Sequence, residues 1–223
     1  MTTNLLNNND FNIKDNKVSY RKTQAERRKD SEEKILEAAL ELVAEYGAYA
    51  VTLAQIGEKA GYSRGLPAHK YGNKSNLLKE LAKYIAAKFS IFTIKATIPQ
   101  PGIQCLESMI QAYLLRKDKN WKPAWALIML TTEAKLLGND LSEYMAQYND
   151  KVLSFLRKNI ETAILENHLK SDCNATEIAA FFLSIFRGAT LLRMNNPKID
   201  LNGIYQQAFF YLDQLRASPS KRK

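Results

Sequence analysis

The residues best suited to chemistry lie in the stretch 61–74 (GYSRGLPAHKYGNK), between two segments with helical patterns. Four of its side chains can carry positive charge, namely Arg64, His69, Lys70 and Lys74, and it contains no acidic residue. Such a stretch is either a plain loop or a very short helix that contacts a negatively charged partner. The elements on either side of it decide between the two.

The flanking pattern indicates a helix, a tight turn and a second helix. Thr52 and Gln55 have the spacing of a capping box, which predicts a helix over 52–60. Ser63 offers a new N-cap, so a second short helix is expected over 64–71. This layout is the helix-turn-helix, whose second helix enters the DNA major groove with its N-terminal residues foremost.

Small and rigid residues in this segment favour close contact with a partner. Gly57 lies one helical turn before the bend, where a missing side chain lets two backbones approach. Pro67 lacks an N–H, which is tolerated near a helix start. Gly65 and Ala68 present little side chain, so a partner can come close to the backbone. Lys74 lies near the start of the next helix, where a cation costs free energy unless an anion such as phosphate is bound.

Elsewhere the sequence offers no catalytic or metal-binding set. Two histidines and two cysteines are scattered without ligand spacing, and there is no Ser-His-acid set, phosphate-binding glycine loop or carboxylate pair. We therefore expect no enzymatic activity, no metal and no cofactor. Cys105 and Cys173 are expected to be reduced. The formal net charge of +9 over 223 residues favours a polyanionic partner without identifying it.

The sequence predicts a soluble protein of the cytoplasm. Its first residues lack a basic region followed by an apolar run, so they do not form a secretory signal. The longest apolar run, 178–186, is broken by Arg187 and is far shorter than the ~20 residues of a membrane span. No membrane association is expected.

Helical patterns fill almost the whole chain, so we predict an all-α protein. The first helix ends at Tyr46, and either Thr23 or Asp30 could cap its start. A Pro- and Gly-containing break at 98–102 separates two helical regions. The predicted organisation is a disordered Asn-rich tail (1–22), a helix-turn-helix domain with its connecting helix (23–92), a helical ligand-binding and dimerisation domain (93–217) and a basic tail (218–223). In the second domain we expect helices at 103–117, 123–137, 141–168, 175–195 and 202–217.

The run ILEAALELVAEYGAYAVTLAQIGEKAGYSRGLPAHKYGNKSNLL resembles the N-terminal DNA-binding domain of TetR/AcrR-type transcriptional regulators, over about residues 25–90. The resemblance implies a three-helix DNA-binding head, a fourth connecting helix, a helical effector-binding domain and a homodimer. The sequence departs from the common pattern at Gly57, Tyr62, Ala68 and Tyr71. Ala68 replaces an aromatic residue that usually touches the phosphate backbone in the family. We expect Pro67, His69 or Lys70 to share that contact.

The predicted DNA interface combines the short helix with a basic run at 21–29. Taken alone, the run is a solvated helix end, but before a helix-turn-helix it is expected to lie along phosphates. The groove or backbone contacts are expected from Arg64, Gly65, Pro67, His69 and Lys70, and the phosphate contacts from Arg21, Lys22, Arg27, Arg28, Thr52, Tyr71 and Lys74. Gln55 and Ser63 complete the predicted DNA-binding set.

The helix over 175–195 is apolar almost all round, so both of its sides must be covered. One side can face the core, and the other requires a partner chain. The last helix carries a strong apolar stripe. We predict that these two helices pair with their symmetry mates in a dimer interface that contains Ile185, Gly188, Leu192, Tyr205, Phe209 and Leu212. Gly188 either allows close helix contact or is an isolated glycine that costs about 1 kcal/mol.

The resemblance also implies an effector pocket in this half of the chain. The candidates for its wall are Tyr113, Trp121, Trp125, Met129, Phe155 and Phe182, with ordinary core packing as the alternative for each. We predict a homodimeric regulator, a repressor of a near-palindromic operator that an unknown small molecule releases. The alternative is a sequence-nonspecific or partner-controlled helical DNA-binding protein. A third hypothesis is a helical lipid carrier or enzyme, but the sequence contains no set of catalytic residues for it.

Overall fold

The computed structural model describes residues 23–95, 100–115 and 121–217, and the two predicted tails lie outside this range. The described residues form helices joined by turns, with a single isolated β-bridge between Leu169 and Arg216. The predicted all-α fold is therefore confirmed. The helices are α1 Gln24–Tyr46, α2 Leu53–Lys59, α3 Leu66–Tyr71, α4 Lys74–Lys95, α5 Ile103–Leu114, α6 Lys122–Leu137, α7 Asn139–Leu165, α8 Ala175–Asn195 and α9 Asn202–Gln214.

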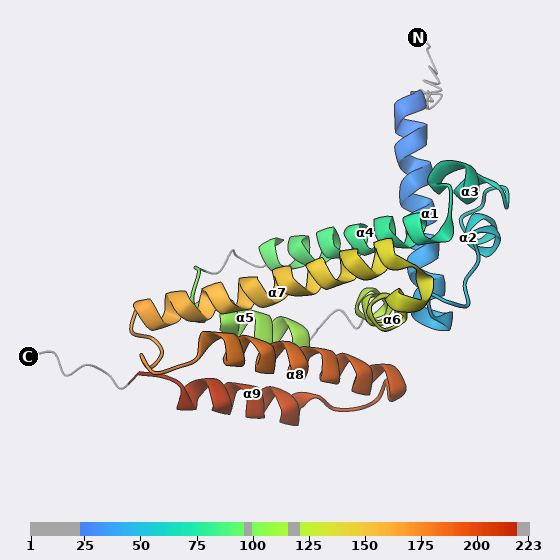
Figure 1. Cartoon of the computed structure of the whole chain (residues 1–223). Helices are drawn as coiled ribbons and strands as arrows, with labels where there is room; N and C mark the ends of the chain where they lie inside the picture. The colour runs from blue at the N-terminus through green and yellow to red at the C-terminus, as the bar shows by residue number, and fades with distance from the viewer. Residues whose placement is uncertain (1–22, 96–99, 116–120, 218–223) are drawn as a thin grey trace, which may run out of the picture.

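The helices form a small head and a longer body (Figure 1). In the head, α1 stands across one end of the molecule, and α2 and α3 pack beside it. In the body, α4 and α7 run side by side away from the head, and α8 and α9 lie along the opposite side of the body from α4. Helix α5 packs between α7 and α9, while α6 lies where the head meets the body.

Polar side chains fix the starts of several helices. Of the two predicted N-caps for α1, the structure uses Thr23. The side chain of Thr23 accepts from the N–H of Glu26, and the side chain of Glu26 accepts from the N–H of Thr23. The capping box predicted for α2 is also present, with Thr52 and Gln55 as its members. At the start of α4, the side chain of Asn73 accepts a hydrogen bond from the N–H of Asn76 at 2.8 Å.

Three helices of the body end three residues earlier than their sequence patterns predict, and the first is α5, which ends at Leu114 rather than 117. Helix α7 ends at Leu165 rather than 168, because Asn167 takes a left-handed conformation with φ of 57°. Helix α9 ends at Gln214 rather than 217, because residues after it pair with the segment that follows α7. There the N–H of Lys170 donates to Leu215 and the N–H of Ala217 donates to His168. These backbone bonds tie the end of α9 to the body.

The buried side chains form two clusters, and one of them joins the head to the body. The body cluster comes from α5 to α9 and includes Phe182 and Leu212. The head cluster comes from α1, α2 and α4 but also contains Ala126, Leu130 and Ala134 of α6. Because α6 contributes to the head's own core, the head cannot move freely on the body.

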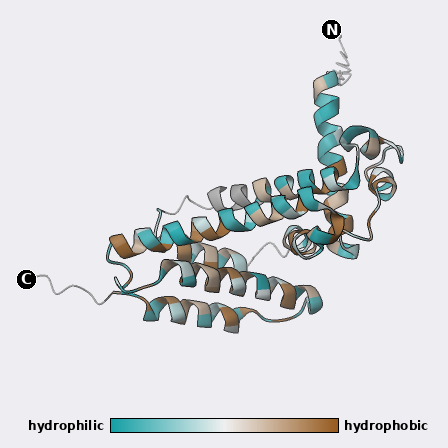
Figure 2. Ribbon diagram, in the orientation of Figure 1, coloured by the Kyte–Doolittle hydropathy of each residue, from teal (hydrophilic) through white to brown (hydrophobic). Residues whose placement is uncertain are grey.

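Helix α8 is apolar on two sides (Figure 2). Phe182 and Phe186 are buried in the body, whereas Phe181 and Leu192 are 41% and 45% exposed. By length and composition alone α8 could cross a membrane, although a third of the relevant segment is already buried in the protomer. A core helix of a soluble protein passes the same test. What the structure requires is a cover for one apolar face of α8.

Candidate nucleic-acid interface

The turn between α2 and α3 depends on Gly57. A Cβ atom at this position would lie 2.6 Å from the carbonyl oxygen of Ser63 and 3.1 Å from Cδ of Pro67. The turn itself uses Gly61, whose φ of 78° suits a residue without a side chain. The expected close approach of two backbones at Gly57 is confirmed, and it sets the angle at which α3 leaves α2.

Helix α3 begins at Leu66, two residues later than predicted. Pro67 has no N–H to donate to the carbonyl of Ser63, so the hydrogen bonds of an α-helix begin only with that from His69 to Gly65 at 3.0 Å. Ser63 is therefore not the side-chain cap, and Gly65 occupies the N-cap position. The prediction of Ser63 as an N-cap was wrong.

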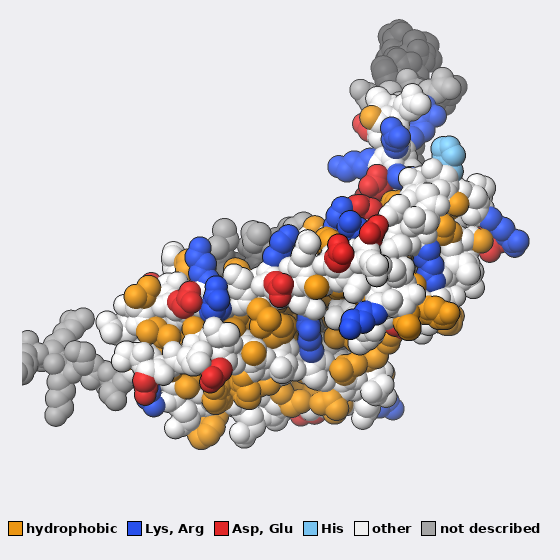
Figure 3. All heavy atoms as spheres, viewed as in Figure 1, with side chains coloured by type: hydrophobic (Ala, Val, Ile, Leu, Met, Phe, Trp, Pro, Cys, Tyr) orange, Lys and Arg blue, Asp and Glu red, His pale blue; other side chains and the backbone are white. Residues whose placement is uncertain are grey.

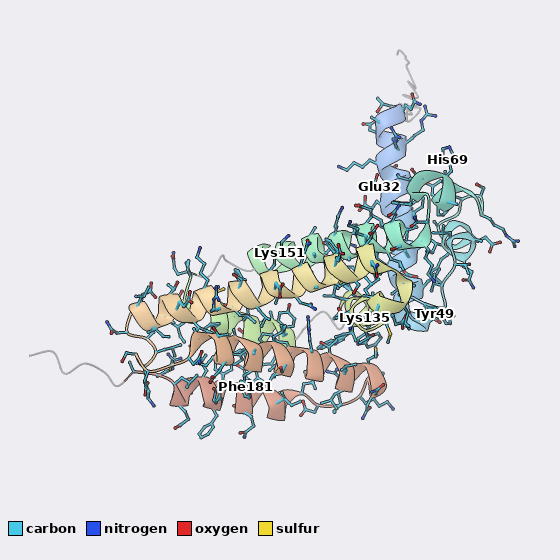
Figure 4. The ribbon with its side chains drawn as sticks, in the orientation of Figure 1. Glu32, Tyr49, His69, Lys135, Lys151 and Phe181 are labelled. Atoms are coloured by element: carbon cyan, nitrogen blue, oxygen red, sulfur yellow. The ribbon has the colours of Figure 1, made fainter. Side chains whose placement is uncertain are left out.

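The leading end of α3 is open to solvent. Ser63, Arg64, Gly65 and His69 are all exposed. The side chain of Arg64 is 76% exposed and forms an ion pair with Glu58 of α2 at 2.5 Å. His69 projects from α3 away from the body (Figure 4), and Lys and Arg side chains gather on the surface at the same end of the molecule (Figure 3). These residues are therefore accessible to a partner.

Two residues of the predicted contact set are turned inward. Pro67 is buried and packs against Gly57. The hydroxyl of Tyr71 is buried without a hydrogen-bond partner among the described residues, and burial raises the pKa of this phenol well above its usual range. Both residues pack inside the head, although the sequence predicted that they contact DNA.

Lys70 is also turned away from solvent. Its Nζ lies 3.1 Å from a carboxylate oxygen of Glu32 and donates to the backbone carbonyl of Arg28 at 3.2 Å. Its side chain is only 18% exposed. Lys70 therefore ties α3 to α1, whereas the sequence predicted that it contacts the DNA groove or backbone. The sequence did not reveal Glu32 as its partner, because 38 positions separate the two residues.

Lys74 is the first residue of α4, close to the predicted position. Its Nζ donates to the carbonyl of Tyr49 at 2.6 Å. Burial lowers the pKa of Lys74, and the nearby Glu133 partly opposes this effect. An ammonium has three donors, so this bond leaves others for a phosphate.

The remaining predicted phosphate contacts lie on the head surface. Arg27 and Arg28 are exposed near the start of α1, and Thr52 and Gln55 are exposed at the start of α2. Thr52 and Gln55 already cap each other, so their exposed atoms have a structural role as well. Arg21 and Lys22 lie outside the described residues.

A contact between head and body was missed by the sequence reasoning. Glu133 of α6 accepts a hydrogen bond from the backbone N–H of Tyr49 at 2.5 Å. Its carboxylate also lies against Gly47, where a Cβ atom would come within 2.7 Å of it. No local pattern marks Glu133, because the bond joins residues 84 positions apart.

The body contains a cavity of about 40 Å³ between α5, α6, α7 and α8. Tyr113 lines it, as predicted for an effector pocket. The other five candidates are not among the residues that line this cavity. Trp121 and Phe182 are buried in the body core, Trp125 packs against that core, and Met129 packs against the head cluster. Phe155 is 50% exposed on α7.

The predicted dimer residues fall into two groups. Leu192 is exposed, and Ile185 and Gly188 are partly exposed on the same side of α8. Nothing in the protomer lies within 4 Å of a Cβ added at Gly188. Tyr205 and Phe209 are partly exposed, but Leu212 is fully buried in the body core. Leu212 is therefore not available to a partner, whereas Phe181 and Phe210, which were not predicted for the interface, are exposed.

The comparisons with known proteins agree with this geometry. Residues 35–81 match the family model described as "Bacterial regulatory proteins, tetR family". No curated protein sequence matches the chain.

Solved structures match nearly the whole fold at low sequence identity. A TetR transcription regulator from Haloarcula marismortui has a TM-score of 0.72 and 22% identity over 84% of this chain and 99% of that one. A structure from Saccharomonospora viridis, described as a transcriptional regulator in complex with choline, has a TM-score of 0.73 and 15% identity over 85% and 99%. The regulator FadR from Bacillus subtilis, in complex with stearoyl-CoA, has a TM-score of 0.68 and 18% identity over 81% and 96%. The chain thus carries the helix-turn-helix domain of the TetR family of bacterial regulatory proteins and folds as a TetR-family transcriptional regulator.

Proposed function

We propose that the protein is a homodimeric transcriptional repressor that binds a near-palindromic operator. The observation that carries this proposal is the exposed leading end of α3, where Ser63, Arg64, Gly65 and His69 face solvent beside an N-terminal turn held by Gly57. The ion pair between Arg64 and Glu58 is exposed, so DNA can replace it at little cost in free energy. In this proposal, Arg64 and His69 reach base edges or the sugar-phosphate backbone.

The phosphate contacts surround this leading end. Arg27, Arg28, Thr52, Gln55 and Lys74 lie on the surface of the head, at or near helix starts. Phosphate contacts of this kind position the protein without reading sequence. Arg21 and Lys22, which lie outside the described residues, remain predicted phosphate contacts in this proposal.

In a homodimer, the second copy of the protein supplies another helix α3 for contact with DNA. The apolar face of α8, with Phe181, Ile185, Gly188 and Leu192, requires a cover, and Phe210 adds an exposed aromatic ring on α9. We assign this cover to the same face of a second copy, since a two-fold interface is self-complementary. Two copies of α3 about 34–36 Å apart would then meet successive major grooves.

A small molecule is proposed to release the protein from its operator. Two similar structures hold small molecules, choline in one and stearoyl-CoA in the other. In this chain α6 would carry the signal, because it lines the body cavity and also contributes to the head cluster. A ligand changes DNA affinity only when it binds one arrangement of the heads better than the other. A regulator of this kind works in the cytoplasm, with no membrane association and no enzymatic activity.

Recovery of bound genomic fragments tests the proposal. Fragments retained by the purified protein are sequenced, and the affinity for the recovered duplex is compared with that for a scrambled duplex at rising salt. We expect the recovered site to bind at least about 10³-fold more tightly. A ratio near one at every salt concentration would instead support the sequence-nonspecific alternative.

A further inference from the structure

The body cavity combines an apolar lining with one cationic side chain. Most of its wall consists of hydrocarbon and aromatic groups from α5 to α8, including Leu127, Ile128, Val152, Leu183 and Phe186. Two threonines also line it, and its one charged residue is Arg187 of α8, which interrupts the apolar run of that helix. Ligand sites are often built this way, with an apolar wall and a few polar groups that fix orientation.

Arg187 has capacity left for an anion. The side chain is half-buried, and one nitrogen of its guanidinium donates to the side-chain oxygen of Asn149 on α7. None of the described carboxylates forms an ion pair with it. A guanidinium has five N–H donors in a planar fork, and a neutral amide oxygen leaves its charge uncompensated. A hydrogen bond between α7 and α8 requires only a neutral donor. The positive charge of Arg187 is therefore not needed to hold these two helices together.

Tyrosines next to Arg187 add neutral polar groups. Tyr113 and Tyr148 both line the cavity, and the ring of Tyr113 stacks on Phe186 with centroids 4.5 Å apart. Burial raises the pKa of Tyr148, while Arg187 opposes the shift. The Tyr148 hydroxyl therefore stays protonated near neutral pH, where it can donate a hydrogen bond. The polar groups at this end of the cavity favour an acceptor that carries negative charge.

We propose that the cavity binds an organic carboxylate with an apolar body, its carboxylate on Arg187 and its body among the side chains of α6, α7 and α8. This rests on the proposed function, in which a small molecule acts on this half of the protein. Arginine binds carboxylates through two parallel hydrogen bonds, and the ligand would compete with Asn149 for the fork. The cavity of about 40 Å³ holds only a few water-sized groups, so the apolar body opens it by displacing side chains.

Calorimetric titration of the full-length protein with octanoate and with octanamide tests the assignment. The two probes have the same chain length and differ in charge. We expect the wild-type protein to bind octanoate at least ten-fold more tightly than octanamide. Arg187→Met should remove this preference and leave octanamide binding unchanged, whereas Arg187→Lys should retain part of it. Arg157→Met, on the exposed surface of α7, should retain the full preference.

Equal affinity of the wild-type protein for the two probes, or no binding of octanoate, would overturn the proposal. An undiminished preference in Arg187→Met would do the same. If Arg187→Met does not fold, the affinities of the wild-type protein for octanoate and octanamide still test the proposal, because that comparison requires no variant. DNA affinity of the ligand-free protein is measured in parallel. A protein that binds DNA but not octanoate refutes the carboxylate site alone, and one that binds octanoate but not DNA refutes the proposed function alone.

Discussion

The carboxylate of Glu133 on α6 accepts a hydrogen bond from the backbone N–H of Tyr49, in the loop that follows α1, at 2.5 Å. Lys74 at the start of α4 donates to the carbonyl of the same Tyr49. The backbone of one loop residue thus links α6 of the body with α4, the helix that leaves the head. Residues Leu127, Ile128 and Thr131 of α6 line the cavity, so one helix contacts both the cavity and the head.

Replacement of Glu133 by alanine should destabilise the protein. The variant leaves the exposed N–H of Tyr49 to water instead of its carboxylate acceptor, and loss of a hydrogen bond of this kind costs about 0.5–1.5 kcal/mol. Glu133→Gln retains an acceptor and should lose less. Urea denaturation followed by circular dichroism measures both. Glu161→Ala, at an exposed ion pair on α7, is the control and should change the free energy of unfolding by less than about 0.5 kcal/mol. A Glu133→Ala variant as stable as this control would contradict the role of Glu133.

Replacement of Gly57 by alanine should disturb the turn between α2 and α3. The new Cβ would lie 2.6 Å from the carbonyl oxygen of Ser63, which is backbone and cannot rotate away. Overpacking of this kind costs about 1–3 kcal/mol, and it should also weaken DNA binding by displacing α3. Thermal denaturation and a DNA-binding titration measure the two effects.

Gly65→Ala provides a matched control in the same motif. Nothing lies within 4 Å of a Cβ at Gly65, and its φ of −83° suits any residue. The substitution should therefore leave stability unchanged or raise it by up to about 1 kcal/mol. If it also weakens DNA binding, the backbone at Gly65 lies close to DNA, as proposed. Equal stability of Gly57→Ala and Gly65→Ala would refute the packing argument.

Lys74→Ala should weaken binding to every DNA sequence. A lost phosphate contact reduces the slope of log affinity against log salt concentration by about 0.9. Lys151→Ala, on the body helix α7 (Figure 4), is the control and should leave the slope unchanged. A lower affinity of Lys74→Ala with an unchanged slope would mean that Lys74 acts only through its bond to Tyr49.

Gly188→Leu should prevent dimerisation and leave the protomer folded. The protomer has space for the new side chain, since nothing lies within 4 Å of the added Cβ, whereas a partner helix packed closely there would be pushed away. Light scattering gives the mass, and circular dichroism confirms the fold. Gln147→Leu, on the exposed surface of α7, is expected to remain dimeric. A dimeric Gly188→Leu variant would place the interface elsewhere.

Local features of this fold were predictable because they depend on neighbours in sequence. The capping box of Thr52 and Gln55 and the requirement for glycine at position 57 both act within a few residues, and both are present in the structure. The start of α3 was placed too early, since the absent N–H of Pro67 delays the first helical hydrogen bond. Even this error was local and could be corrected from the chemistry of proline.

The positions of long side chains were not predictable, because they depend on partners far along the chain. Lys70 lies next to Glu32, and Lys74 donates to Tyr49, so neither ammonium is as free as its sequence context suggests. The cavity wall was missed for the same reason. Of the aromatic residues expected there, Trp121 and Phe182 fill the core instead, and the wall combines aliphatic residues of α6, α7 and α8 with other aromatic and polar ones.

The small volume of the body cavity has a mechanical consequence for a regulator of the proposed kind. The cavity has room for only a few water-sized groups, so a larger occupant would act as a wedge, and helix α6 would transmit the displacement to the loop at Tyr49. The response would then depend on ligand bulk as well as on affinity. A compact molecule that fits without spreading the walls would bind without changing DNA affinity. A bulkier molecule of equal affinity would displace the head.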